Sequence, residues 1–396
     1  MPRSITPAAS FLLVLLAACA GGEDAPGVEV ERTTLANGAT RLVYGALDAA
    51  DAPVLEADLR IGAFEGEGPE VFGDVRAVDA DAEGNIYVLD FPASEIRVFD
   101  AQGRHLRTIG GKGEGPGEIS ASTGFALAAD GTLWVHDHGQ WRWLHLTASG
   151  EEIERVPLHV PSWGYMTDVV IDARGRLWKP TSHSDEPRAR EPEPGISEWT
   201  ARSYWKSLDP ASGAIDSVFV GEISGRTHIA RWGSGARYSM IPNDARSSSI
   251  PDPAGGFWVT RSEPYRIVRL SEAGDTTLVI EAAVSGPPVS EQERRDYLAA
   301  AEERGPEDLR IATEIAEAMR DSKPAIASIR VDDEGRLWVE RTVEGDEPPI
   351  FDLFTREGDY VGSVRLGFKP AGFFVHRVRH GAFYTLQRDE LDVSYV

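Results

Sequence analysis

Hydrophobic and polar positions alternate along this chain in short runs that recur six times. Each run follows a turn that contains glycine, and each carries an aromatic residue near its middle. The runs are GNIYVLD (84–90), GTLWVHD (131–137), GRLWKPT (175–181), GFWVTR (256–261), GRLWVER (335–341) and GAFYTLQ (381–387). Alternation with a period of two places successive side chains on opposite faces of a strand. Each run therefore predicts a β-strand that is entered from a tight turn.

Each run also sits inside a longer repeat. Another apolar stretch precedes most of the runs, a third follows and closes at a second glycine turn, and a fourth short strand completes the unit; the stretches around residues 75–110 read VRAVDAD, GNIYVLD, IRVFDAQG and HLRTIG. Such a four-stranded antiparallel sheet is apolar on both faces and is not stable alone in water. Stacking the sheets around an axis buries both faces, so the sequence predicts an all-β, six-bladed β-propeller.

The recurring aromatic residue belongs to the scaffold in this interpretation. It is Tyr87, Trp134, Trp178, Trp258, Trp338 or Tyr384, and we expect it to pack between neighbouring blades. Residues that break the repeat are then the positions at which to look for function.

The two ends of the chain predict how the ring closes. The sixth repeat ends with LDVSYV and lacks a fourth strand, whereas residues 54–62 (VLEADLRIG) resemble a fourth strand without a blade. Pairing the N-terminal strand into the last blade would remove two exposed sheet edges. We therefore predict that residues 54–396 form the propeller domain, closed in this way.

Two stretches, IGGKGEGPGE (109–118) and the segment 84–103, resemble the NHL-repeat family of propellers. In that family a glycine-rich loop precedes the strand, turn and strand of each repeat. The later repeats lack the glycine-rich loop. The resemblance implies the propeller fold and nothing finer.

Long irregular insertions are predicted on one face of the ring, at residues 157–168, 182–203 and 221–246. The longest connection, residues 285–324, has helical signals: a capping box at Ser290 and Glu293, a stop at Gly305-Pro306, and an apolar stripe ending at Met319. Loops on a rigid scaffold commonly carry recognition, so this asymmetry favours a binding face. It is also consistent with decoration of a purely structural module.

The N-terminus predicts export. Residues 1–19 read MPRSITPAASFLLVLLAAC, with Arg3 ahead of an apolar run too short to span a bilayer. Residues 16–19 (LAAC) resemble the lipobox of bacterial lipoproteins. The resemblance implies a signal peptide over 1–18 and a Cys19 that carries acyl chains such as palmitate and anchors the protein in the membrane. An ordinary secretory signal is the alternative.

Residues 19–53 would then form the lipidated N-terminus, a tether and a hairpin signalled by Asn37-Gly38. Ala20 after the cysteine resembles the sorting pattern for the outer membrane. We therefore expect an exported protein, lipid-anchored to the cell envelope, in the outer membrane.

The composition of the chain limits the classes of partner and site that we expect. The chain has 396 residues, with 64 acidic and 40 basic side chains and a formal net charge of -24. A polyanion repels nucleic acid, so we expect no nucleic-acid partner. The single cysteine excludes an intramolecular disulfide and a multi-cysteine metal site.

Several polar residues near the predicted loop-bearing ends of the blades are candidate site residues. They are Asp90, Asp137, His138, His183 and His376, with Arg261 and Arg341 at the equivalent positions of blades four and five. The two arginines would oppose a metal ion and could hold a carboxylate or sulfate. Trp163 and Trp232 lie in the predicted insertions and could stack on a ligand.

These features predict a binding or protein-interaction module without a cofactor or catalytic residues, whose ligand is an envelope protein, a peptide or a glycan. The alternative is a metal-dependent lactonase or lyase, because propellers of those types hold a divalent metal over the channel. His136 and His138 share one strand face and, with Asp137, could bind one ion such as calcium or zinc.

Overall fold

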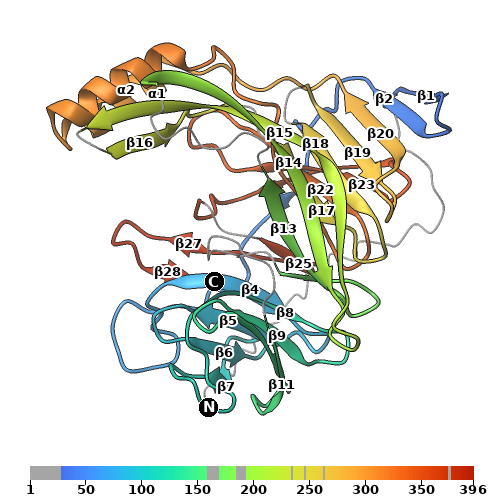
Figure 1. Ribbon diagram of the computed structural model, residues 1–396, viewed down its shortest axis with the longest axis vertical. Coiled ribbons are helices and arrows are strands. Elements are labelled where there is room, and N and C mark those ends of the chain that lie inside the picture. The colour runs from blue at the N-terminus through green and yellow to red at the C-terminus, as the bar shows by residue number, and fades with distance from the viewer. Residues whose placement is uncertain are drawn as a thin grey trace, which may run out of the picture.

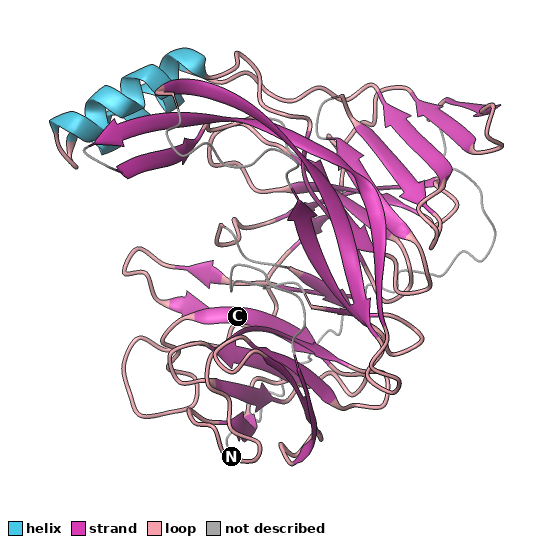
Figure 2. Ribbon diagram, in the orientation of Figure 1, coloured by secondary structure: helices cyan, strands magenta, loops and turns pink. Residues whose placement is uncertain are grey.

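Sheets arranged around a common centre form most of the molecule, and two helices lie at one end (Figures 1 and 2). This computed structural model describes residues 28–157, 169–183, 193–232, 235–244, 247–261, 264–372 and 376–396. The expected signal peptide, Cys19, the tether and Trp163 lie outside the described residues. Within those residues, neither helix is long and apolar enough to cross a membrane.

The six repeats form the six blades in chain order, with antiparallel neighbours in each. Blade one comprises β4 (Val75–Ala80), β5 (Ile86–Asp90), β6 (Glu95–Phe99) and β7 (His105–Gly110). Blade two comprises β8 (Ser122–Leu127), β9 (Leu133–Asp137), β10 (Arg142–Leu146) and β11 (Glu152–Pro157). Blade three has β12 (Val170–Ile171), β13 (Leu177–His183), β14 (Gly195–Leu208), β15 (Ile215–Trp232) and β16 (Gly235–Met240). All-β architecture with six blades is thus confirmed.

Blades four and five have the same order. Blade four comprises β17 (Ser247–Pro251), β18 (Phe257–Arg261), β19 (Arg266–Leu270) and β20 (Thr276–Ala282). Blade five comprises β21 (Ile326–Val331), β22 (Leu337–Arg341), β23 (Ile350–Phe354) and β24 (Tyr360–Leu366). Blade six is smaller and consists of two ribbons, β25 (Arg377–Arg379) with β26 (Ala382–Tyr384) and β27 (Gln387–Arg388) with β28 (Ser394–Tyr395).

Six apolar clusters hold the ring together, one at each junction between neighbouring blades. In order around the ring they include Leu89 with Phe125, Trp143 with Leu177, Trp178 with Phe257, Trp258 with Leu337, Phe351 with Phe383, and Phe99 with Leu386. The last cluster joins blade six to blade one, so the apolar contacts run around the whole circle.

The recurring aromatic residues lie in these clusters, as predicted. Each of the six falls in a different one: Tyr87, Trp134, Trp178, Trp258, Trp338 and Tyr384. The strand alternation explains the arrangement, because Ile86 and Val88 face blade six while Tyr87 and Leu89 face blade two. The repeat therefore supplies one aromatic residue to each junction between blades.

A buried aspartate fixes the turn before several of these aromatic residues. Asp332 accepts hydrogen bonds from the backbone N–H groups of Glu334 and Arg336, and from the indole Nε1–H of Trp338 at 2.9 Å. Asp172 holds Trp178 in the same way at 2.8 Å. The turn and the aromatic anchor are therefore locked to each other in both blades.

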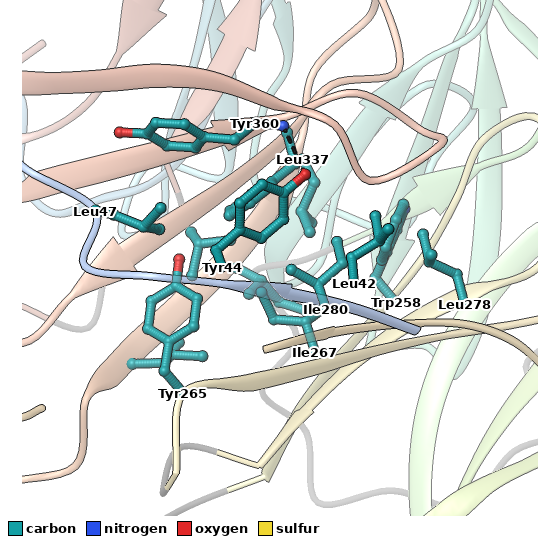
Figure 3. Packing of buried hydrophobic residues seen from close by; sticks show 14 of the residues in the cluster. Leu42, Tyr44, Leu47, Trp258, Tyr265, Ile267, Leu278, Ile280, Leu337 and Tyr360 are labelled. Carbon is teal, nitrogen blue, oxygen red and sulfur yellow. Dashed lines mark hydrogen bonds between the residues drawn. The ribbon is translucent and has the colours of Figure 1, made fainter. Parts of the chain in front are cut away.

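An N-terminal hairpin extends blade four, as the Asn37-Gly38 signal predicts. β1 (Val30–Thr34) pairs with β2 (Thr40–Tyr44), and β2 lies parallel to β20. The hydroxyl of Tyr44 donates to the carbonyl of Gly358 at 2.8 Å and accepts from the N–H of Tyr360 at 3.1 Å (Figure 3). The hairpin thereby seals the outer part of the junction between blades four and five.

Ring closure differs in part from the prediction. β3 (Val54–Leu55) pairs in parallel with β24 of blade five rather than with the last strand. Ile61 then exchanges two backbone hydrogen bonds with Val396, at 2.7 and 2.9 Å. The segment 54–62 serves two blades because Leu55 packs at the junction of blades five and six, while Ile61 packs at the junction of blades six and one.

The insertions also differ from the expected loops. Much of 182–203 and 221–246 is continuous strand, because β14 and β15 run on past the blade and pair with each other and with β16. The predicted helical connection is confirmed: α1 (Glu291–Glu302) starts at the Ser290 capping box, and α2 (Pro306–Ala318) begins at Pro306. Ile311, Ile315 and Met319 pack the helices onto this strand extension.

We expect the contact between the chain ends to stabilise the ring. Deleting residues 394–396 removes both hydrogen bonds to Ile61, the packing of Val396, and the Arg60 guanidinium 3.6 Å above the Tyr395 ring. The free energy of unfolding in urea should fall by about 2–4 kcal/mol.

The control is Leu391→Ala, because Leu391 is 69% exposed, and it should change the free energy by less than about 0.5 kcal/mol. A deletion variant as stable as the full chain would contradict the closure described here.

Candidate functional site

A cavity of about 430 Å³ lies between blades five and six and is here called the mouth cavity. It opens on the face where blades join one another and where second strands turn into third strands. Its lining residues are Ala327, Ser328, Arg330, Glu340, Val343, Gly345, Glu347, Pro349, Lys369, Pro370, Ala371, Gly372 and His376. A volume in the range of roughly 300–1,000 Å³ is typical of small-molecule sites.

A bulge in β21 shapes the wall of this cavity. The pairing register between β21 and β22 shifts between Ile326 and Ser328, so Ala327 is the extra residue. Bulges of this kind redirect side chains beside binding sites. Ser328 then stands opposite Glu340, and its hydroxyl donates to the Glu340 carboxylate at 2.5 Å.

A second, smaller cavity of about 50 Å³ lies along the axis of the ring, here called the channel cavity. The innermost segments of blades two to six line it, from Ala126 and Leu127 round to Val378 and Arg379. Arg330 and His376 line both cavities. These two side chains therefore form the boundary between the mouth and the channel.

The channel carries a concentration of positive charge. Arg330, Arg377 and Arg379 all line the channel cavity. The buried carboxylate of Asp79, on the inner strand of blade one, receives Arg379 Nε at 3.1 Å and lies 4.0 Å from Arg377 Nε. Arg377 and Arg379 thus share the carboxylate of Asp79, and Arg330 lines the same cavity, in a protein whose formal charge is -24.

Burial and this positive charge shift the pKa values of His376 and Glu340. Burial, followed by the charges of Arg330 and Arg377, lowers the pKa of His376 to about 3. His376 is therefore neutral near pH 7, and its Nδ1 lies 2.7 Å from the hydroxyl of Thr385. Burial also raises the pKa of Glu340, against the opposing effects of the Ser328 hydrogen bond and Arg330.

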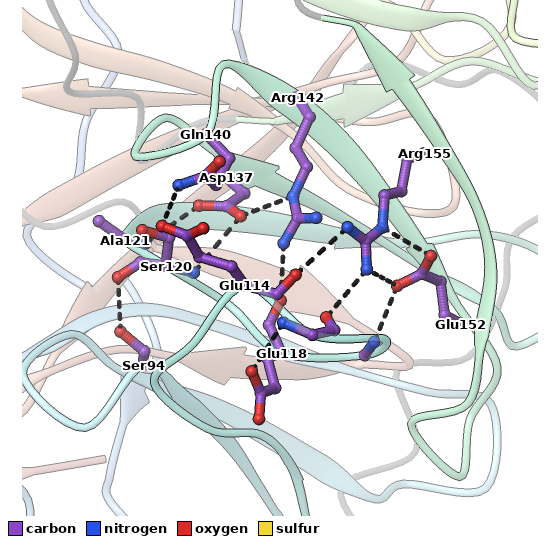
Figure 4. Close-up of polar contacts among 12 residues, drawn as sticks. Ser94, Glu114, Glu118, Ser120, Ala121, Asp137, Gln140, Arg142, Glu152 and Arg155 are labelled. Atoms are coloured by element: carbon purple, nitrogen blue, oxygen red, sulfur yellow. Dashed lines mark hydrogen bonds and ion pairs between the residues drawn. The ribbon is translucent and has the colours of Figure 1, made fainter.

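The structure places two predicted site residues, Asp90 and Asp137, in supporting roles. Asp137 accepts from the backbone N–H of Ala121 at 3.0 Å and from Arg142 Nε at 2.8 Å, and it fixes the loop that enters blade two (Figure 4). Asp90 does the same in blade one, with the N–H of Asp74 at 3.0 Å and Arg97 at 3.0 Å. Both carboxylates are buried, and these contacts give them a structural role.

His136 lies between blades two and three, in a setting that does not suit a metal, whereas the ring of His138 stacks 6.4 Å from that of Phe91, directly after β5 in blade one. Lys179 Nζ lies 3.3 Å from His136 Nε2. Burial, then the charge of Lys179, lowers the pKa of His136 to about 3, and burial lowers that of Lys179 to about 8. An ammonium at the imidazole nitrogen opposes a cation there, and Asp137 is already engaged by Arg142.

No group of three or more histidine, cysteine, aspartate or glutamate side chains that could hold a metal ion occurs among the described residues. The hypothesis of a calcium or zinc ion at His136, Asp137 and His138 therefore has no fitting ligand set in that part of the chain.

The two arginines predicted to mark a positive site lie elsewhere. Arg341 makes a buried two-pronged ion pair with Asp352, at 2.6 and 2.8 Å, and also donates to the carbonyl of Leu47. Arg261 is exposed at the end of β18. Neither lines the two cavities, so the positive charge of the site comes from Arg330, Arg377 and Arg379 instead.

The remaining candidates are only partly placed. His183 ends β13 opposite Arg202, and Trp232 ends β15 opposite Gly235; their side chains, like the whole of Trp163, lie outside the described residues. Other aromatic residues divide between the two predicted roles. Trp143 and Trp205 are buried between blades, whereas Trp141 and Trp199 are exposed by 55% and 41%.

One signal in the sequence could have found Glu340. Two positions after the recurring aromatic residue, blades one and six have Leu89 and Leu386, whereas blade five has Glu340. Blades two, three and four have His136, Pro180 and Thr260 at this position, so blade five is the one repeat with a carboxylate there. Arg330 gives no such signal, because only the assembled ring places its strand beside the channel.

The family comparison agrees with this geometry. A family model described as "6-bladed beta-propeller" matches residues 71–155, which span blades one and two. This chain is a six-bladed β-propeller. No curated protein matches the sequence of the propeller at a significant level.

The solved structures with a similar fold are distant from this chain in sequence. A putative exported protein from Bacteroides fragilis is 13% identical, with 85% of this chain and 75% of the other covered and a TM-score of 0.40. A DUF4221 family member from Bacteroides vulgatus is 11% identical (82% and 91%, TM-score 0.46). A catalytically inactive virginiamycin B lyase from Staphylococcus aureus, with quinupristin, is 11% identical (93% and 98%, TM-score 0.37). None is similar enough to transfer a function.

The buried histidines predict a loss of stability in acid. Each of His136 and His376 has a pKa of about 3 in the fold instead of 6.5. The unfolded chain therefore binds a proton below pH 6.5 that the folded protein does not bind until about pH 3. Each histidine should lower the free energy of unfolding by about 1.4 kcal/mol per pH unit within this window.

Urea unfolding of His136→Gln between pH 6 and pH 4 should show a slope smaller by that amount than the slope of the unaltered protein. His105→Gln, at an exposed position on β7, is the matched control and should keep the original slope. Equal slopes for both variants would show that His136 titrates normally in the fold.

Proposed function

We propose that this propeller is an exported, lipid-anchored binding module of a bacterial cell envelope, and that its ligand occupies the mouth cavity. The observation that carries the proposal is the combination of size and lining. About 430 Å³ opens on the loop-bearing face, with an apolar wall and convergent polar groups at Arg330, Glu340 and His376. Most small-molecule sites combine an apolar wall with a few such polar groups.

The position of the cavity supports this reading over a purely structural role. Every blade junction of the ring is filled by an apolar cluster, including the one between blades five and six. The hollow lies beside that cluster and is lined in part by loops, namely residues 343–349 and 369–372. Loops held on a rigid ring are the usual carriers of recognition.

The anchor rests on the sequence. LAAC at residues 16–19 follows a short apolar segment with Arg3 ahead of it, which supports cleavage before Cys19 and its acylation. Two or three acyl chains hold a protein firmly at a membrane, because each buried methylene contributes about 0.8 kcal/mol. We place the protein in the outer membrane on the strength of Ala20.

The cavity proposal is tested by filling the cavity. Ala327 is exposed on its wall, so Ala327→Trp should occupy the space while leaving the fold intact. In a thermal-shift screen of organic acids, sugars, amino acids and short peptides, at least one compound should raise the melting temperature of the unaltered protein by several degrees. That shift should disappear in Ala327→Trp.

Ala382→Trp is the matched control, since Ala382 is exposed on the hairpin of blade six and does not line the mouth cavity. It should keep the full shift. The proposal fails if no compound stabilises the protein, or if Ala327→Trp responds as strongly as the unaltered chain.

The anchor is tested separately by Cys19→Ala in the full chain expressed in a bacterial host. The unaltered protein should fractionate with membranes and gain the mass of its acyl chains at Cys19, whereas the variant should do neither. Ser10→Ala, within the same predicted signal peptide, should be lipidated normally. Membrane recovery of Cys19→Ala equal to that of the unaltered protein would overturn lipid anchoring.

A further inference from the structure

The charged floor of the mouth cavity indicates the chemistry of its ligand. We infer that the mouth cavity binds a small organic acid, with the ligand carboxylate at Arg330 and its apolar part against the outer wall. This inference rests on the proposed function and adds the ligand class.

Cationic side chains lie at both ends of the mouth cavity. Arg330 lies at the boundary between the two cavities, Arg377 and Arg379 lie immediately beyond it in the channel, and Lys369 stands at the mouth. Arg377 and Arg379 share the carboxylate of Asp79, and Lys369 at the rim is paired with the exposed Asp346. The guanidinium groups thus concentrate at the deep end of the cavity, and an anion entering from the mouth would move toward Arg330.

The groups beside Arg330 are compatible with a bound anion. His376 stays neutral beside Arg330, so it contributes no charge but can hydrogen-bond. Two glutamates line the cavity: Glu340 is half-buried and accepts a hydrogen bond from Ser328, and Glu347 is exposed. Burial raises the pKa of Glu340, against the opposing effects of the Ser328 hydrogen bond and the charge of Arg330.

Much of the lining of the mouth cavity is apolar. Ala327, Val343, Pro349, Pro370 and Ala371 form the apolar part of the wall. A guanidinium at one end and an apolar wall along the side match a molecule with one carboxylate and an aliphatic or aromatic body. A free inorganic anion would use only the guanidinium end.

Recognition by charge is tested with matched probes. Hexanoate and benzoate are compared with hexanamide and benzamide, which have nearly the same shape and no charge, and with inorganic sulfate. Isothermal titration should show at least one acid binding at least tenfold more tightly than its amide and than sulfate. Raising the salt concentration from 50 to 500 mM should weaken the acid by several-fold.

Variants locate the carboxylate. Arg330→Gln should weaken the acid at least tenfold and bring its affinity close to that of the amide. Arg330→Lys keeps the charge but lacks the planar fork, so it should fall between the two. Arg261→Gln, at the exposed arginine predicted from the sequence alone, should bind within twofold of the unaltered protein.

If the Arg330 variants unfold, Lys369→Gln still tests whether positive charge at the cavity contributes to binding of the acid. Lys369 is 54% exposed at the rim, so this variant should fold, and it should weaken the acid by about two- to threefold. Thermal melts of all the variants separate loss of binding from loss of fold.

The outcomes distinguish the inference from the proposed function. An amide that binds as tightly as its acid, sulfate that binds as tightly as the acid, or a folded Arg330→Gln variant with unchanged affinity overturns the inference. If a neutral compound binds and Ala327→Trp abolishes that binding, the mouth cavity is a binding site and only the ligand class is wrong.

Discussion

The burial of apolar surface between adjacent sheets is the interaction on which this molecule depends. Each blade is apolar on both faces, and the six junction clusters of the ring cover all of those faces. The free energy of burial, on the order of 25 cal/mol per Å² of apolar surface, becomes available only when the neighbours are present. Ring closure through Ile61 and Val396 is therefore part of the stability of every blade.

This dependence constrains where function can lie. The faces of the blades are filled, and polar residues placed there are paired within the fold, as with Asp137 and Arg142 or Arg341 and Asp352. The channel and its mouth are left, because six inner strands cannot close on the axis. Charges that converge there, such as Arg330, Arg377 and Arg379, come from strands far apart in the sequence that only the ring brings together.

Departures from the repeat have different meanings in the structure. His136 stands where blades one and six have leucine, and Lys179 stands where four other blades have valine; the two side chains meet each other at 3.3 Å between blades two and three. Glu340 also breaks the repeat, but it lies on the wall of the mouth cavity. Departure from the pattern marks positions of interest, yet the partner found across the junction decides whether the departure supports the scaffold or a site.

The sequence by itself determined the fold class, the number of blades, the aromatic residue at each junction, the N-terminal hairpin and the helical connection. These follow from short-range alternation, turn residues and caps, which are local properties of the chain. Only the tertiary structure decided that β3 joins blade five, that β14 and β15 continue as long strands, and that Arg330 rather than Arg261 or Arg341 faces the cavity. Those outcomes depend on register and on contacts between distant blades, because a side chain's surroundings in a ring are supplied by residues that its own repeat does not contain.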